Sequence, residues 1–289
     1  SSKGFFPVSG ISHEQVLRSL ELVTVLLGQN LSADELLAEL RARFDVYTSV
    51  GCDEQGTVLF TGYYTPVFLA SRERSGPFQH PLHRPPEGHL KDVITGRTIG
   101  LKRADGSINP VYPGRRELIN SPLLKDRELV YLEDAFQAYV VGVQGSAILK
   151  LDDGSRLEVG YAGTNGHAYA SLGLALVKAG KLKREQLNLK SMIEYFKANP
   201  QDFEPMTASN ERYVFFQESQ GGPYGSLNEQ VTRLRSIATD KTIFPRGALC
   251  FMEARLPVGE GVYRGFTLDQ DAGGAIRAPG RCDVYMGVG

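Results

Sequence analysis

Glycine and proline punctuate this chain along its whole length, with 32 glycines and 15 prolines among 289 residues. Proline ends helices and strands because it lacks a backbone donor, and glycine favours turns that other residues avoid. The pattern therefore predicts many turns and short strands, with helices confined to a few stretches. A chain of this length buries enough surface for one large domain or two modest ones.

Two capping boxes predict helices close to the N-terminus. Ser12–Gln15 and Ser32–Glu35 both fit the S/T-x-x-E/Q pattern, in which the first and last side chains each bind a free backbone N–H. Apolar residues follow at helical spacing: Val16, Leu17, Leu20, Val23 and Leu27 in the first helix, and Leu36, Leu37, Leu40 and Phe44 in the second. We expect a helical hairpin, broken at Gly28–Asn30, whose role is packing.

Beyond this hairpin, short strands are predicted on both sides of a mixed middle region. The expected strands are Thr57–Thr61, Ala147–Leu151, Arg156–Tyr161, Tyr213–Phe216, Thr232–Ala238, Ala248–Arg255 and Gly265–Leu268. Asp152–Ser155 has the composition of a hairpin turn between the second and third of them. Two further helices are expected at about Ala168–Lys178 and Arg184–Lys197.

A proline-rich passage separates the first strand from the middle region, with prolines at 77, 81, 85, 86 and 110. We interpret it as a surface excursion and a crossing between domains. One economical arrangement is a barrel made from the first and last segments, with a second domain inserted between them. Such a layout would leave a cleft where the two domains meet, which is a common location for a ligand site.

The charge balance excludes some functions. The chain has 32 Lys and Arg against 33 Asp and Glu, a formal charge of −1, so nothing favours a nucleic acid or an acidic membrane as partner. The apolar stretch Leu22–Leu27 is far too short to span a bilayer. Ser1–Lys3 does not resemble a signal peptide, which maturation would have removed from an exported protein.

Neither cysteines nor histidines predict a metal or a cofactor. Cys52, Cys250 and Cys282 fit no zinc spacing, and we interpret them as ordinary core thiols. We expect the cluster His80, His83 and His89 to lie in a solvated loop rather than on a metal. His167 precedes a predicted helix, where a hydrogen bond at the helix start is favoured over a catalytic base.

Nucleophilic hydrolysis is not indicated either. Gly142–Ser146 contains the letters of the G-x-S-x-G elbow in the wrong order. Its Gln144, Gly145 and Ser146 instead offer groups that hydrogen-bond a sugar or a peptide. The glycine pairs at 221–222 and 273–274 lack the lysine and the spacing of a phosphate loop.

Three aspartates remain as candidates. Asp240, Asp271 and Asp283 are predicted at strand ends in a glycine-rich barrel. Any one of them alone is more simply explained as a turn cap. Together they favour a ligand site, because strand ends at a barrel mouth are where polar groups meet a ligand.

Five motifs, in this order, resemble the membrane-bound lytic murein transglycosylase A family. They are Gly62–Pro66, Val143–Ser146, Tyr161–Tyr169, Arg235–Asp240 and the segment from Asp271–Ile276 to Asp283–Tyr285. The last two also resemble the three-aspartate domain of several bacterial wall-remodelling proteins. The resemblance runs from about Gly62 to the end of the chain, with a slightly longer connection between Asp271 and Asp283.

The resemblance implies a mainly β fold with accessory helices. A double-psi β-barrel domain would comprise residues 1–66, including the N-terminal helices, and 222–289. An inserted β-rich domain with helices would comprise residues 67–221, with a groove between the domains. The family cleaves the β-1,4 bond between N-acetylmuramic acid and N-acetylglucosamine in peptidoglycan without water, and leaves a 1,6-anhydro sugar.

The resemblance also implies roles for single residues. Asp283 would be the catalytic acid and then the base, Asp271 its supporting carboxylate, and Asp240 would shape the site. We expect burial, or the charge of Asp271, to raise the pKa of Asp283. The substrate groove would be lined by Thr61, Tyr63, Tyr64, Thr65, Gln144, Gly145, Ser146 and Asn165.

The implied partners are peptidoglycan glycan strands and other murein enzymes, with no cofactor, no metal and a monomeric protein. By resemblance the full-length precursor would be a periplasmic lipoprotein of the outer membrane. Two alternatives stay open at this point. One is a β-glycan hydrolase on the same barrel, and the other is a non-catalytic wall-binding module.

Overall fold

In the computed structural model, residues 10–93, 96–110, 112–256 and 261–289 are described. The chain divides into two compact units. The first runs up to Tyr64 and resumes over Tyr224–Gly287, and the second comprises Thr65–Pro223 with Val288–Gly289. The sequence placed the corresponding boundaries after residues 66 and 221.

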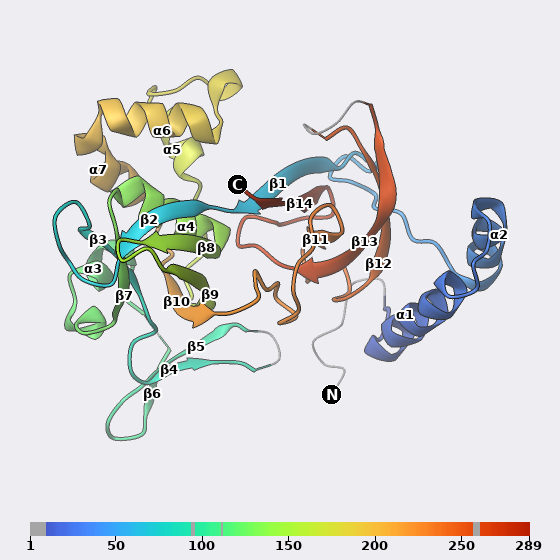
Figure 1. Ribbon diagram of the computed structural model, residues 1–289, viewed down its shortest axis with the longest axis horizontal. Coiled ribbons are helices and arrows are strands. Elements are labelled where there is room, and N and C mark those ends of the chain that lie inside the picture. The colour runs from blue at the N-terminus through green and yellow to red at the C-terminus, as the bar shows by residue number, and fades with distance from the viewer. Residues whose placement is uncertain (1–9, 94–95, 111, 257–260) are drawn as a thin grey trace. The chain divides into compact units, whose positions relative to one another are not determined.

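The first unit is built on a five-stranded sheet (Figure 1). Its order is β1 (Leu59–Thr65), β14 (Arg281–Val288), β11 (Ser236–Ala238), β13 (Tyr263–Asp271) and β12 (Leu249–Ala254). The central strand β11 is antiparallel to β14 and parallel to β13. Ile237, Met252, Ala254, Cys282 and Val284 form its buried core. The mainly β class is confirmed, while closure as a double-psi barrel stays a prediction.

Helices α1 (His13–Leu27) and α2 (Ala33–Arg43) precede this sheet in the chain. Both predicted capping boxes are present, and a turn at 28–30 separates the helices. Helix α1 buries Val16 and Leu26 and contacts β12. No side chain of α2 is fully buried, so the packing role predicted for both helices applies to α1.

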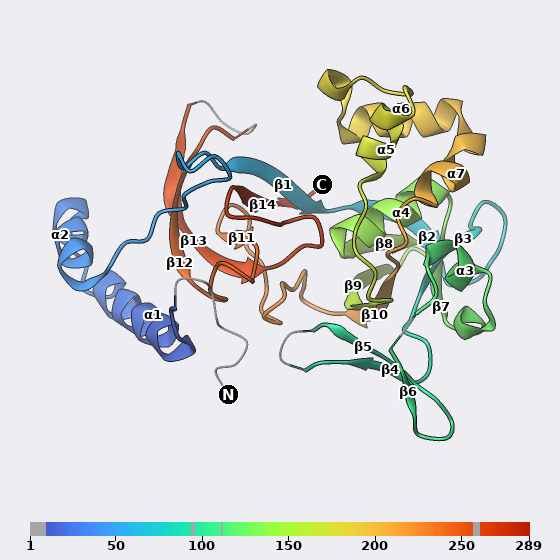
Figure 2. The same cartoon turned by 180° about the vertical axis from the view of Figure 1, so that it is seen from behind.

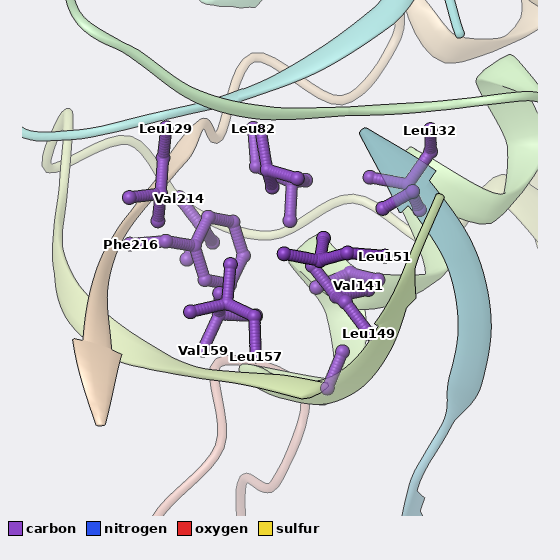
Figure 3. Close-up of a cluster of buried hydrophobic side chains, with 13 residues drawn as sticks. Leu82, Leu129, Leu132, Val141, Leu149, Leu151, Leu157, Val159, Val214 and Phe216 are labelled. Carbon is purple, nitrogen blue, oxygen red and sulfur yellow. The ribbon is translucent and has the colours of Figure 1, made fainter. Parts of the chain in front are cut away.

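The second unit contains a six-stranded sheet. Its order is β10 (Val214–Ser219), β9 (Arg156–Thr164), β8 (Ser146–Leu151), β2 (Val67–Ser71), β7 (Glu128–Leu132) and β3 (His80–His83). The predicted β8–β9 hairpin is confirmed, with register from Ser146 opposite Gly160 to Lys150 opposite Arg156. Figure 3 shows the main core of this unit, where Leu82, Leu132, Leu149, Val159 and Phe216 converge.

Helices and a small sheet flank the larger sheet. The helices are α3 (Arg115–Ile119), α4 (Ala135–Gln144), α5 (Leu172–Lys178), α6 (Leu189–Ala198) and α7 (Phe203–Thr207). The small antiparallel sheet comprises β4 (His89–Lys91), β5 (Thr98–Lys102) and β6 (Ile108–Asn109). Both views place α5 to α7 and the small sheet on opposite sides of this unit (Figures 1 and 2).

Several predicted elements are corrected by the structure. The proline-rich passage lies entirely within the second unit, and its part β3 is a sheet strand with Leu82 and His83 buried. It is therefore neither a domain crossing nor, in that part, a solvated excursion. Helix α5 starts only after its cap Ser171, and the next predicted helix is interrupted before α6, whose cap is Asn188.

Within the described residues, no helix is both long enough and apolar enough to cross a bilayer.

Candidate active site

Two carboxylates flank the central strand of the first unit. Ala238 of β11 pairs with Asp271 of β13 on one side and with Asp283 of β14 on the other. Directly paired residues present their side chains to the same face of a sheet. Since neighbouring strands lie about 4.8 Å apart, the two aspartate Cα atoms are roughly 10 Å apart. The topology thus places two of the three predicted aspartates on either side of one residue, Ala238.

Asp283 is the third residue of β14, not a strand-end residue as predicted. Thr61 of β1 donates its hydroxyl to Asp283 Oδ1 at 2.7 Å. No other hydrogen bond to this carboxylate occurs among the described residues. Burial raises the pKa of Asp283, and this outweighs the opposite effects of Thr61 and Arg281. The carboxyl group is therefore poised to keep a proton closer to neutral pH than a free aspartate does.

Asp271 ends β13 and is held by backbone donors. Its Oδ1 accepts the N–H of Ser226 at 3.0 Å and that of Ala272 at 2.7 Å. Burial nonetheless raises the pKa of Asp271 to about 6, against the lowering effect of these bonds. At neutral pH this side chain is an anion, and it becomes neutral under mildly acidic conditions.

Tyr63 lies within electrostatic reach of both aspartates. Its ring packs against that of Tyr285 with centroids 5.2 Å apart. Its hydroxyl is buried and completes no hydrogen bond within the described part of the chain, although it lies close enough to Asp271 to lower the pKa of that carboxyl. Burial, and then the charges of Asp271 and Asp283, raise the pKa of Tyr63. The phenol stays neutral and has a proton to donate.

Asp240 has a different environment. It accepts bonds from the N–H and hydroxyl of Thr242, at 3.0 and 2.8 Å, and from the N–H of Ala278 at 2.9 Å. Burial alone would raise the pKa of Asp240, but these bonds and Arg277 outweigh it and lower the pKa. Asp240 is thus a fixed anion that joins two loops.

The sequence did not single out a buried ion pair next to these groups. Lys241 pairs with Asp269, and Thr239 donates its hydroxyl to Asp269 Oδ2 at 2.6 Å. The only local signal was an aspartate directly after the predicted strand Gly265–Leu268, two residues before Asp271. Its partner is distant in sequence, so no spacing rule could have found the pair.

Of the remaining predicted groove residues, Gln144, Gly145 and Ser146 are consecutive in the second unit, and Ser146 adjoins Thr65. Tyr64 is half-buried at the end of the first segment of the first unit. Thr65 is buried, with its hydroxyl 3.4 Å from that of Ser146. Gln144 ends α4, and Gly145 caps it with φ 81°, a left-handed conformation that favours glycine. The chain turns there directly into β8.

Asn165 does not line a surface. It is only 2% exposed, and its amide donates to the carbonyls of Pro113 and Glu211 and accepts the N–H of Tyr213. Both amide protons are used by backbone oxygens, so Asn165 braces three chain segments. Its predicted groove-lining role is corrected to this structural one.

The histidines of the predicted solvated loop are packed side chains. His83 Nδ1 lies 2.6 Å from the hydroxyl of Tyr213, and burial lowers the pKa of His83 to about 4. His89 contacts the Tyr112 hydroxyl in the same way, at 2.6 Å. The solvated-loop prediction is therefore wrong. No group of three or more potential metal ligands occurs in the described ranges.

His167 also differs from its prediction. Its Nε2 donates to the carbonyl of Tyr112 at 2.7 Å, away from the start of α5. The thiols Cys250 and Cys282 belong to the core of the first unit, as predicted, whereas Cys52 is exposed.

Comparison with known proteins bears on this arrangement. A family model described as the MltA specific insert domain matches residues 59–217, and a second, the 3D domain, matches residues 235–289. The chain belongs to the membrane-bound lytic murein transglycosylase A (MltA) family. The relative from Escherichia coli K12 is 30% identical over an alignment of 255 residues, and the match covers 85% of this chain and 64% of that protein. This MltA-family chain thus spans less than two thirds of that relative's length.

Solved structures of lytic transglycosylases are similar to this chain in fold. Escherichia coli MltA with bound chitohexaose gives a TM-score of 0.68 at 26% identity, over 83% of this chain and 68% of that one. The lytic transglycosylase LtgG of Burkholderia pseudomallei gives 0.55 at 35% identity, over 80% and 65%. A transglycosylase from Agrobacterium tumefaciens, at 22% identity, shares the fold over 99% and 81%, with a TM-score of 0.81.

Proposed function

We propose that this chain is a lytic transglycosylase that cleaves the β-1,4 bond between N-acetylmuramic acid and N-acetylglucosamine in peptidoglycan, with a 1,6-anhydromuramyl product. The observation that supports this most is Asp283, a carboxyl group with a raised pKa, one hydroxyl partner and a second carboxylate across β11. The names of its MltA relatives, and the chitohexaose bound to one of them, support the same substrate class.

In the proposed mechanism, Asp283 first acts as an acid. Its carboxyl proton passes to the glycosidic oxygen as the bond between that oxygen and the muramyl C1 breaks. Asp283, now an anion, then takes the proton of the muramyl 6-hydroxyl, whose oxygen bonds to C1. The nucleophile belongs to the substrate, and a well-oriented intramolecular attack reaches effective molarities on the order of 10⁵ M or more. A second carboxylate that activates water, as hydrolases require, is unnecessary.

The neighbours of Asp283 have separate roles in this proposal. Thr61 donates to the anionic form of Asp283 and so holds it ready to act as the base. Asp271, an anion above about pH 6, offsets the positive charge that develops at C1. Tyr63, whose neutral hydroxyl lies close to Asp271, can donate its proton to a sugar oxygen. Asp240 keeps the surrounding loops in place.

Residues of both units are proposed to contact glycan. In the second unit these are Gln144, Gly145 and Ser146, which offer amide, backbone and hydroxyl groups. The buried Thr65 instead supports the Ser146 hydroxyl from below the surface. Tyr64 offers an aromatic ring, on which a sugar can stack. We place the enzyme in the periplasm, because the relatives are named as membrane-bound murein enzymes.

Digestion of purified sacculi tests this function. The proposal predicts soluble muropeptides that end in anhydromuramic acid, identified by mass spectrometry. Products heavier by one water would instead indicate a glycan hydrolase. Binding to sacculi without any release would indicate a wall-binding module. Either result would contradict the proposal.

Thr61→Val should alter the pH dependence of this activity. The substitution keeps the shape of the side chain and removes the donor to Asp283, so the anionic form loses stabilisation and its pKa rises. Because a hydrogen bond to a charged group contributes about 1.5–3 kcal/mol, we expect the basic limb of the kcat profile to move up by about one to two pH units.

The matched control is Thr267→Val in β13, whose buried hydroxyl has no hydrogen-bond partner in the described part of the chain. It should leave the profile unchanged. An unchanged profile in Thr61→Val as well would show that the Thr61 bond does not set the proton affinity of the active carboxyl group.

A further inference from the structure

The buried pair of Asp269 and Lys241 has no part in the chemistry proposed above. The Asp269 side chain is completely buried, and only 9% of the Lys241 side chain is exposed. Lys241 Nζ pairs with Asp269 Oδ1 and donates to the Thr239 hydroxyl at 3.1 Å. Removing two charges from water is expensive, and such pairs add little net stability over an apolar pair. Their presence beside the active carboxylates therefore calls for a different explanation.

The pair lies at an irregular step in β13. Ser236 and Ala238 of β11 pair with Leu268 and Asp271, so an advance of two residues along β11 corresponds to an advance of three along β13. This is a β-bulge, a feature that often re-aims side chains next to active sites. Asp269 lies inside the bulge, and Lys241 and Thr239 lie on the segment that follows β11. Their contacts connect the bulge, which directly precedes Asp271 in β13, to the segment that follows β11.

The charged and titratable groups around Asp271 come from several elements. Lys241 lowers the pKa of Asp271 through its charge, and Tyr63 of β1 does so through its hydroxyl. Arg246 donates to the Ser226 hydroxyl at 3.1 Å, and the N–H of Ser226 binds Asp271. Asp283 and Tyr285 of β14 raise the pKa of Tyr63 through their charges. Lys241 is the cation that both acts on Asp271 and is itself fixed by a buried partner.

We propose that Asp269 and Lys241 form a positioning pair for Asp271. By fixing the bulge they hold the Asp271 carboxylate beside Ala238, and the lysine charge favours its anionic form. Neither residue contacts the substrate in this proposal. The catalytic consequence, a stabilised positive charge at the muramyl C1, rests on the function proposed above.

The titration of Asp271 tests the pair. Carbon-13 NMR follows its carboxyl carbon against pH, with the signal assigned by its loss in Asp271→Asn. Lys241→Met should raise the pKa of Asp271 by about one unit, a tenfold tighter proton. The double variant Asp269→Asn/Lys241→Met should raise it by less, because it also removes the negative charge of Asp269. Lys241→Arg, which keeps the charge, should restore it. The double variant removes both charges, so it avoids an unpaired buried carboxylate.

Arg264→Met is the matched control, because Arg264 forms an exposed ion pair with Glu253 between β13 and β12. It should leave the pKa of Asp271 unchanged. A folded double variant in which Asp271 titrates as in the wild type would overturn the proposal. So would a double variant that cannot fold, since the pair would then be structural.

The two proposals fail separately. The titration requires no glycan cleavage, so a shifted pKa in a protein that releases no muropeptide would refute the enzymatic function alone. If the function holds, Lys241→Met should lower kcat at neutral pH more than it changes KM, and Lys241→Arg should recover kcat.

Discussion

Replacing Asp283 with asparagine is expected to reduce muropeptide release by at least about 100-fold, since general acid–base catalysis contributes about 10²–10⁴ in rate. The amide cannot deliver an acidic proton to the glycosidic oxygen, and it cannot take one from the 6-hydroxyl. Its oxygen can still accept the Thr61 hydroxyl, so the site should keep its shape. Rates on purified sacculi, with a sedimentation assay for binding, measure the effect.

Asp240→Asn provides the contrast within the same trio. Asp240 is fully engaged by Thr242 and Ala278, and an amide nitrogen in place of one oxygen would face a backbone donor. We expect lower stability but nearly normal turnover of the folded protein. Near-normal turnover in Asp283→Asn would instead mean that another group supplies the proton.

Asp271→Asn should stabilise the protein at pH 8 while it lowers turnover. The pKa of Asp271 is raised from 3.8 to about 6 in the folded state, so folding favours the protonated form. This favourable contribution is complete below pH 3.8 and is lost as the pH rises through 6. We therefore expect the free energy of unfolding of Asp271→Asn to exceed that of the wild type by about 3 kcal/mol at pH 8, an upper bound because the side chain is not fully buried. At pH 4 the expected difference is less than about 1 kcal/mol.

Denaturant unfolding of the wild type and of Asp271→Asn between pH 4 and pH 8 measures this difference. The contributions of the other titrating groups are the same in both proteins and cancel. The asparagine oxygen can still accept the N–H of Ser226 and that of Ala272. A variant that is less stable at pH 8 but retains turnover would show that Asp271 serves only to fix its loop.

The sequence predicted local structure best where local chemistry decides it. The boxes at Ser12 and Ser32 place both helix starts correctly, because the cap and its reciprocal partner lie within one turn. The β8–β9 hairpin is correct for the same reason. Helix α4 was not predicted, although Asp134 caps it. Its apolar residues pack into two different cores, so they do not form the single apolar stripe by which a helix is recognised.

Long-range pairing explains what the sequence could not supply. The family resemblance selected Asp271 and Asp283, but only the register of β11 shows that both flank Ala238. The prolines of 77–86 suggested a solvated loop, yet tertiary packing places Leu82 and His83 in a sheet strand. The family resemblance placed Asn165 in the groove, and its burial follows from contacts with segments far away in the chain.

The central claim is that the bond-breaking step ends with an internal attack by the sugar and not with water. Digestion of sacculi in water enriched in oxygen-18, followed by mass spectrometry of the released muropeptides, tests it most directly. We predict anhydromuramyl ends that contain no oxygen-18 from the start of the reaction. Muramyl reducing ends that have gained one oxygen-18 atom in the initial products would contradict it.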